Sequence, residues 1–295
     1  MPLVTINRLR GRWGNQIIEY AFLRTYAKRY RLDYQIHPWA GQPIFGFHDP
    51  LLRIALPEKL ENYSTPGDYQ TEPLPPNGPE FAEHAFSGWA QYHTNYYAPD
   101  REFIQALYAH VEPAYAGPLP DALAKFLAVP GAKIGLHIRR GDFGRMCFFL
   151  TPVSWYRRWL DQNLARFDRP VAFIGSEDPS VIAAFADYHP VTIEDFGLRW
   201  NRDDFLSEWW FLKHCDVVLT PNSTYSFTAA WLNPHLVECW RSQLTTQTFQ
   251  RIDPWSCEMQ WKETVDQYPG IPGTSLDDNP EWLGGPKPKC KAVPE

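Results

Sequence analysis

The stretch KIGLHIRRGD, residues 133–142, places two adjacent arginines directly after alternating apolar residues. The alternation predicts a buried strand over 133–138, and Arg139 and Arg140 then stand where that strand ends. Ligands of α/β sheets bind beyond the carboxyl ends of the strands. Because a guanidinium group offers a fork of donors that matches phosphate oxygens in pairs, the stretch predicts a diphosphate site. The alternative is a surface ion pair between Arg140 and Asp142.

The chain on the carboxyl side of this stretch alternates between strand and helix patterns. Strands separated by helix-length segments indicate βαβ units and a parallel sheet. We therefore expect residues 130–241 to form a Rossmann-like half. Its further strands are expected at 170–175, 191–193, 216–220 and 236–238, and its helices at 152–167, 180–186, 203–214 and 224–232.

The first 129 residues predict a second, looser Rossmann-like half that faces the acceptor. A strand at 3–6 is followed by Gly11 and Gly14, by a helix that Asn15 could cap and that runs to about residue 31, and by a strand at 34–36. Glycines before a helix can present its amino end to an anion or a polar ligand, although a simple tight turn is the alternative.

The remaining segments are predicted to be irregular or short. Residues 37–100 have no clear periodicity, and the prolines and glycines at 65–79 suggest a lid or an acceptor-facing loop. Short helices are expected at 101–110 and 121–128. The extension 242–295 is expected to be mostly irregular, with a frayed end at 284–295.

Composition excludes several classes of protein. Hydrophobic residues make up 44% of the 295 residues, which is enough for a substantial core, and the net charge of −6 argues against nucleic acid as the main partner. Five cysteines without a C-x-x-C pair favour neither a disulfide framework nor a zinc site, so we expect a cytoplasmic location. No apolar run is long enough to span a membrane, which leaves peripheral attachment open. The sequence gives no indication of the oligomeric state. The content of 13 tryptophans slightly favours a carbohydrate ligand, although tryptophan more commonly serves to pack the core.

Three motifs occur in order: GRWGNQ at 11–16, HIRRGD at 137–142 and NSTYSFTAAWL at 222–232. Together they resemble motifs of the fucosyltransferase superfamily, with most similarity to bacterial-type α-1,2-fucosyltransferases of glycosyltransferase family 11. The GRWGNQ and SFTA segments are more like those of protein O-fucosyltransferases. The resemblance implies an α/β fold of the GT-B type, in which two Rossmann-like halves face a cleft.

The resemblance also implies roles for individual residues. Arg139 would hold the β-phosphate of GDP-β-L-fucose, His137 would face the guanine, and Asn15 would lie beside the fucose and the acceptor hydroxyl. Glu208, where relatives usually carry an aspartate, would read the guanine edge, and Ser226 would donate to the β-phosphate. Further donor-binding residues would be Gly14, Arg140, Asp142 and Phe227.

The catalytic base is not readable from the sequence. Glu19 or Asp142 could serve, or the reaction could proceed without a dedicated base, because a dissociative path needs little proton removal. For Glu19, the alternative is a solvent-facing carboxylate near the helix amino end.

The activity that the resemblance implies is transfer of L-fucose, with inversion, to a glycan hydroxyl, with an α-1,2 linkage to galactose as the first expectation. Another nucleotide sugar, another linkage or acceptor, and a binding protein without turnover are the alternatives. No D-x-D motif stands where it would hold a metal between phosphates, so we expect neither a metal nor a cofactor besides the donor. The adjacent acids Glu177 and Asp178 could bind a metal, but a ribose contact or a helix cap is the preferred interpretation.

Overall fold

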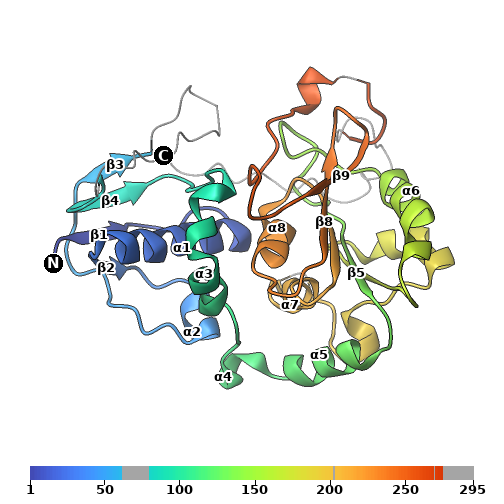
Figure 1. Cartoon of the computed structure of the whole chain (residues 1–295), viewed down its shortest axis with the longest axis horizontal. Helices are drawn as coiled ribbons and strands as arrows, with labels where there is room; N and C mark the ends of the chain where they lie inside the picture. Colours follow the sequence, from blue (N-terminus) through green and yellow to red (C-terminus); the bar gives the residue numbers. More distant parts are fainter. Residues whose placement is uncertain (62–79, 202, 269, 275–295) are drawn as a thin grey trace.

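The computed structural model describes residues 1–61, 80–201, 203–268 and 270–274. The chain forms two α/β units that lie side by side, each built around its own sheet (Figure 1). The predictions made for residues 65–79 and 284–295 lie outside the described residues. Among the described helices, none combines the length and the apolar character needed to cross a lipid bilayer.

The first unit contains a parallel sheet with the strand order β2-β1-β4-β3. Its long helix α1 (Trp13–Tyr30) is buried on most of its sides rather than along one stripe, because it packs between this sheet and the second unit. The strands are β1 (Leu3–Ile6), β2 (Asp33–Ile36), β3 (Glu58–Leu60) and β4 (His84–Ser87). The other helical segments are α2 (Gly41–Phe45), η1 (Thr94–Tyr96), η2 (Ala98–Asp100), α3 (Arg101–Leu107), α4 (Pro113–Ala116) and α5 (Leu119–Ala128).

The second unit contains a sheet with the order β6-β5-β7-β8-β9, parallel except for the edge strand β9. Its strands are β5 (Lys133–His137), β6 (Val171–Gly175), β7 (Val217–Thr220), β8 (Glu238–Gln243) and β9 (Thr248–Ile252). Its helical segments are α6 (Val153–Asn163), η3 (Leu164–Arg166), η4 (Pro179–Tyr188), η5 (Ile193–Phe196), α7 (Ser207–Leu212), α8 (Thr224–Trp231) and η6 (Val265–Gln267).

Several expected elements differ in the structure. The strand expected at 191–193 is reduced to one bridge between Phe173 and Val191, because a capping box at Thr192 starts the turn η5 there. The helix expected at 203–214 begins only at Ser207, where Asp204 accepts hydrogen bonds from the backbone N–H groups of Leu206 and Ser207. Strand β9 lies in the extension expected to be mostly irregular. The division at residues 129 and 241 stays a prediction.

The two units share one apolar core. Trp13 at the start of α1 contacts Trp209 of α7 edge-on at 5.7 Å and Phe205 at 4.6 Å between ring centroids. Residues of α1, α7 and α8 belong to the same cluster of buried side chains, whereas a second cluster fills the far side of the second sheet around α6. Because burial of aromatic surface is the largest stabilising contribution of these contacts, the units are held firmly together.

A segment after β9, residues 253–264, returns to the first unit and is bonded to both units; we call it the return segment. The backbone N–H of Thr94 donates to the carbonyl of Cys257 at 2.9 Å, and the N–H of Cys257 donates to the Thr94 hydroxyl at 2.9 Å. On the other side, the amide of Asn222 exchanges two hydrogen bonds with the backbone of Trp261, at 3.0 and 2.8 Å. The return segment therefore forms a second connection between the units besides the chain through α4 and α5 (Figure 1).

Candidate functional site

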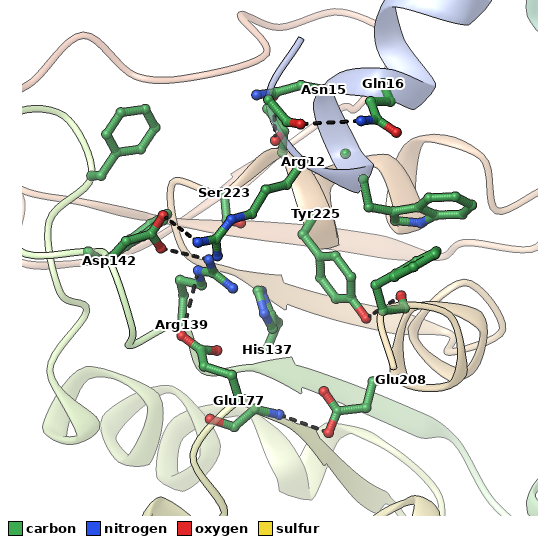
Figure 2. A pocket seen from close by; sticks show the side chains of 18 of the residues that line it. Arg12, Asn15, Gln16, His137, Arg139, Asp142, Glu177, Glu208, Ser223 and Tyr225 are labelled. Carbon is green, nitrogen blue, oxygen red and sulfur yellow. Dashed lines mark hydrogen bonds and ion pairs between the residues drawn. The ribbon is translucent and has the colours of Figure 1, made fainter. Parts of the chain in front are cut away.

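A cavity of about 810 Å³ lies between the two units, and loops that follow β1, β4, β5 and β7 line it. This volume is within the range of small-ligand sites, and its place at the carboxyl ends of parallel strands is the one predicted. Figure 2 shows the cavity from close by. The expected site residues that line it are Gly14, Asn15, His137, Arg139, Asp142 and Glu208. Four others lie behind its wall: Glu19, Arg140, Ser226 and Phe227.

Arg139 lies two residues after the end of β5 and lines the cavity with a side chain that is 15% exposed. Its guanidinium donates to Asp142 at 2.7 Å and lies 3.6 Å from Glu177. Arg12 of the first unit approaches the same Asp142 carboxylate at 3.6 Å, so this carboxylate bridges the two units (Figure 2). Burial raises the pKa of Asp142, but Arg139 and Arg12 outweigh it, and the pKa lies below its usual value. An ionised Asp142 therefore orients two guanidinium groups at the cavity.

The amino ends of two helices meet at the cavity. Gly14 in the first turn of α1 lies so close to α8 that a Cβ there would come within 2.5–2.6 Å of backbone atoms of Thr224 and Tyr225. Neither helix has a side-chain cap at its amino end. Their first-turn N–H groups therefore have no side-chain cap, and their positive dipole ends lie at the cavity wall, which favours an anion in this region.

Asn15 does not cap α1, as the sequence suggested, because the helix begins at Trp13 and Arg12 takes the cap position. Instead, the Asn15 amide oxygen accepts from the Thr224 hydroxyl at 2.8 Å and from the Gln91 amide at 3.1 Å. These two donors come from opposite units. They fix the orientation of the amide and leave its nitrogen as the group that can donate to a ligand.

His137 is buried at the cavity wall, and its Nδ1 lies 2.7 Å from the Ser226 hydroxyl. Burial and, to a lesser degree, Arg139 hold the pKa of His137 well below its usual value, so the imidazole is neutral. The Ser226 hydroxyl is also bonded to Thr220 at 2.6 Å and is fully buried. The expected contacts of Ser226 and Phe227 with the donor are therefore not supported: Ser226 orients His137, and Phe227 packs in the core.

Arg140 turns away from the cavity, which corrects both expectations for it. Its guanidinium donates to the backbone carbonyls of Arg139 and Thr151, each at 3.1 Å, and it is buried rather than paired with Asp142. Alternation along an extended chain explains the difference, because neighbouring side chains point to opposite sides. One arginine faces the ligand site and the other stabilises the loop.

Glu208 lies at the opposite end of the cavity from Asn15 (Figure 2). Its carboxylate accepts from the backbone N–H of Ser176 at 3.2 Å. Burial raises the pKa of Glu208 to about 8, and the negative charges of Glu177 and Asp204 add to this, while the Ser176 hydrogen bond opposes it. A carboxyl group near its pKa can accept hydrogen bonds from a ligand and lose its proton as it does so. The rings of Trp200, Phe205 and Tyr225 also line the cavity, and the sequence had indicated them only through its aromatic content.

Glu19 is completely buried beneath the loop after β1, so it is not the solvent-facing carboxylate that the sequence suggested. It accepts from the backbone N–H of Arg10 at 2.7 Å. Burial raises its pKa to about 9; the Arg10 contact lowers the pKa, and Glu61 raises it further. Because Glu19 does not line the cavity, the proposed base role is not supported for it, and its hydrogen bond instead holds the loop that carries Gly11 and Arg12.

Replacement of Glu19 by Gln should change how stability depends on pH. Between pH 4.5 and 9 the folded protein keeps the Glu19 proton while the unfolded chain has lost it, so rising pH favours unfolding. The free energy of unfolding of Glu19→Gln should therefore increase relative to the wild type by about 1 kcal/mol per pH unit. Urea unfolding at pH 6, 7 and 8 measures this difference. A difference that does not vary with pH would contradict the raised pKa.

The adjacent acids that could have bound a metal have other partners. Asp178 accepts from the backbone N–H of Ser180 and caps η4, which is one of the two roles that the sequence favours, and Glu177 accepts from the backbone N–H of Arg140. Within the part of the chain that the structure describes, no three metal-ligating side chains gather in one place.

Two Rossmann-like units whose sheets direct their carboxyl ends at one shared cavity define the GT-B class of glycosyltransferase fold. The predicted fold class is thereby confirmed. Solved structures agree. NodZ, an alpha-1,6-fucosyltransferase crystallised with GDP, has a TM-score of 0.53 at 13% identity, with 85% of this chain and 98% of that chain covered. The Arabidopsis thaliana protein FUT1 in complex with GDP has a TM-score of 0.57 at 12% identity, with 86% of this chain and 75% of that chain covered.

A curated protein is similar to part of this chain. Galactoside alpha-(1,2)-fucosyltransferase 2 of Gorilla gorilla gorilla is 30% identical over 196 residues, which cover 58% of this chain and 52% of the relative. The chain thus spans about half the length of that relative. No protein-family model matches the chain. The fold and this relative support the resemblance to the fucosyltransferase superfamily that the three motifs indicate.

Proposed function

We propose that the protein is an inverting glycosyltransferase that moves L-fucose from GDP-β-L-fucose to a glycan hydroxyl. The observation that carries the proposal is the convergence of Arg139 and two uncapped helix amino ends on one cavity. This arrangement supplies fixed positive charge where a leaving diphosphate becomes more negative. The solved NodZ structure soaked with GDP-fucose, with a TM-score of 0.52 at 14% identity, supports the choice of donor.

The donor would extend along the cavity from Glu208 to Asn15. The ionised Glu208 would accept from the N–H groups on the guanine edge, which adenine lacks, while the neutral His137 faces the base. Arg139 would grip the β-phosphate in a bidentate manner. The fucose would then lie beside Asn15, whose amide nitrogen is free of the two bonds that fix its oxygen.

The proposed reaction exchanges one bond at the fucose C1 atom for another. The bond between C1 and the β-phosphate oxygen breaks, and GDP leaves with the electron pair; the acceptor oxygen attacks from the opposite face and loses its proton to the solvent. The transition state has oxocarbenium character. Asp142 is a weak base here because its two arginines stabilise the ionised form, so the clamp on the leaving group contributes more than proton removal.

The similar proteins differ in the linkage that they form. The curated relative is named as an α-1,2 enzyme that acts on a galactoside, and NodZ as an α-1,6 enzyme. We take α-1,2 transfer to galactose as the first candidate and another linkage or another GDP-sugar as the second. NMR of the product after incubation with GDP-fucose and a galactoside identifies the linkage. Turnover of another GDP-sugar but not of GDP-fucose would overturn the assigned donor and leave the assigned fold unaffected. Absence of turnover with every GDP-sugar would indicate a binding protein without catalytic activity.

The pKa of Glu208 predicts that donor affinity depends on pH. Below pH 8 the free protein carries a proton on Glu208 that guanine binding must expel, so the affinity should rise about tenfold per unit between pH 6 and 8. GDP-fucose is the suitable ligand because its diphosphate has no titrating group in this range. Calorimetry in buffers with different ionisation enthalpies should detect the released proton. Glu208→Gln is the control and should bind weakly at every pH, and a wild-type affinity independent of pH would contradict the guanine contact.

Chelation should leave activity nearly unchanged. The positive charge that balances the diphosphate is supplied by Arg139 and the helix ends rather than by a metal in this proposal. Initial rates with and without an excess of EDTA should agree within twofold. Complete loss of activity on chelation, with recovery on addition of Mg²⁺ or Mn²⁺, would overturn the prediction.

A further inference from the structure

The cavity extends beyond Asn15 to a part of its wall that the donor residues leave unused. This part is formed by the loop after β4, which contributes Trp89 and Gln91, and by Gln260 of the return segment. Trp89 and Gln91 lie on the first unit, whereas Glu208 and the aromatic side chains near it lie on the second. The Trp89 ring and the side-chain amides of Gln91 and Gln260 therefore lie beside the expected reaction centre without a role in donor binding.

We infer that Trp89 and Gln91 form a subsite for a pyranose ring of the acceptor. The inference rests on the proposed function and deepens it, because it names the class of acceptor and the residues that hold it. The Trp89 side chain is half-buried and lies against Gly11, where a Cβ would come within 3.1 Å of the ring, and Trp89 also lines the cavity. A pyranose presents apolar C–H groups on one face and hydroxyl groups at its edge, which suits an aromatic ring with a neighbouring amide.

The loop that carries Trp89 is held from below by a buried carboxylate. Glu61, 3% exposed, accepts from the backbone N–H groups of Trp89 at 2.8 Å and Ala90 at 3.1 Å. Gly88 leaves no room for a side chain, since a Cβ there would lie 2.3 Å from the Glu61 carboxylate. Ala90 has a φ of 52°, in the left-handed region that an alanine rarely adopts. Strained backbone that its surroundings over-determine is typical of ligand sites.

Gln91 connects this subsite to the reaction centre. Its amide nitrogen donates to the Asn15 oxygen at 3.1 Å, so the residue that would contact the sugar also orients the Asn15 amide. A pyranose stacked on Trp89 would therefore present an edge hydroxyl toward Asn15 and the fucose C1. A peptide acceptor would gain less, because the subsite offers a flat apolar surface and amides and no charged side chain on this loop between residues 85 and 92.

Two independent measurements test the inference. The first is transfer from GDP-fucose to methyl β-D-galactopyranoside, methyl β-D-glucopyranoside and methyl N-acetyl-β-D-glucosaminide, with a serine- and threonine-containing peptide as the rival acceptor. The second is saturation-transfer NMR of methyl β-D-galactopyranoside in the presence of GDP, which needs no turnover. The variants are Trp89→Ala, the conservative Trp89→Phe, and Trp200→Ala, which removes a tryptophan from the nucleotide end of the same cavity.

We expect Trp89→Ala to raise the acceptor KM at least tenfold and to abolish the NMR signal, while its Kd for GDP stays within twofold and shows that it is folded. Trp89→Phe should restore most of the affinity, and Trp200→Ala should weaken GDP without changing the acceptor KM. The exposed Tyr115 is the matched surface control, and Tyr115→Ala should change nothing.

An unchanged acceptor KM in Trp89→Ala, or transfer to the peptide but to none of the glycosides, would overturn the inference. The proposed function fails separately, through a wild type that neither binds nor turns over GDP-fucose. In that case an NMR signal that depends on Trp89 would still support the sugar subsite, and the absence of this signal would contradict the subsite.

Discussion

Replacement of Arg139 by Ala is expected to lower kcat about a thousandfold, because removing a preorganised positive donor from a leaving group typically has an effect of this size. The fold should persist. The side chain lies at the cavity wall, its partner Asp142 is 53% exposed, and Arg12 remains beside that carboxylate. The loss of free energy of unfolding should therefore stay below about 1 kcal/mol.

Arg139→Lys distinguishes the contribution of the positive charge from that of the guanidinium geometry. Lysine keeps the charge but not the bidentate fork, so it should recover only part of the activity. Arg157→Ala is the matched control, because Arg157 also pairs with an aspartate, at 2.8 Å, but on the surface, and it should change kcat by less than twofold. Initial rates at saturating donor and thermal melts by circular dichroism measure both effects. A loss of less than tenfold for Arg139→Ala would remove the phosphate clamp from the mechanism.

Gly14→Ala is expected to have the second large effect. The added Cβ would lie 2.5–2.6 Å from backbone atoms of Thr224 and Tyr225, and backbone cannot rotate away as a side chain can. The helices α1 and α8 must therefore separate, which breaks the hydrogen bond between Asn15 and Thr224 and shifts both helix ends relative to the donor. We expect a loss of activity of at least a hundredfold and of stability by about 2 kcal/mol.

Gly117→Ala provides the control for this substitution. Gly117 has a φ of +48° and a ψ of −129° and open space where its Cβ would lie, so alanine there should cost about 1–3 kcal/mol of stability through backbone strain and leave kcat unchanged. Kinetics and urea unfolding of both variants distinguish a contact effect from a general backbone effect. Full activity of Gly14→Ala would show that the close approach of the two helices is not required for the reaction.

The regular part of the fold could be predicted from the sequence because its patterns are local. Strands β5, β6 and β7 are short apolar runs followed by helix-length segments, and each lies within a residue or two of its predicted bounds. The three- and four-residue strands β3 and β4 were missed because partners far along the chain decide their pairing. The polar strand β9 was missed because its hairpin with β8 decides it rather than its own composition.

For the site, the sequence placed the residues that directly follow strands or open helices, such as Arg139 and Asn15. It could not tell which of two adjacent arginines faces the ligand, nor that Ser226 is bonded behind His137, since both depend on tertiary packing. Trp89 and Gln91 lie on a loop without a recognisable motif, and only the fold brings them beside Asn15.

The return segment has a consequence for how a ligand reaches the cavity. It is bonded to Thr94 of one unit and to Asn222 of the other, so hinge opening of the two halves would have to break these bonds along with the shared aromatic core. The cavity is thus preformed, and a ligand should bind without a change in the relative position of the two units. Association rates would then be limited by encounter and by ionic strength rather than by a slow domain rearrangement.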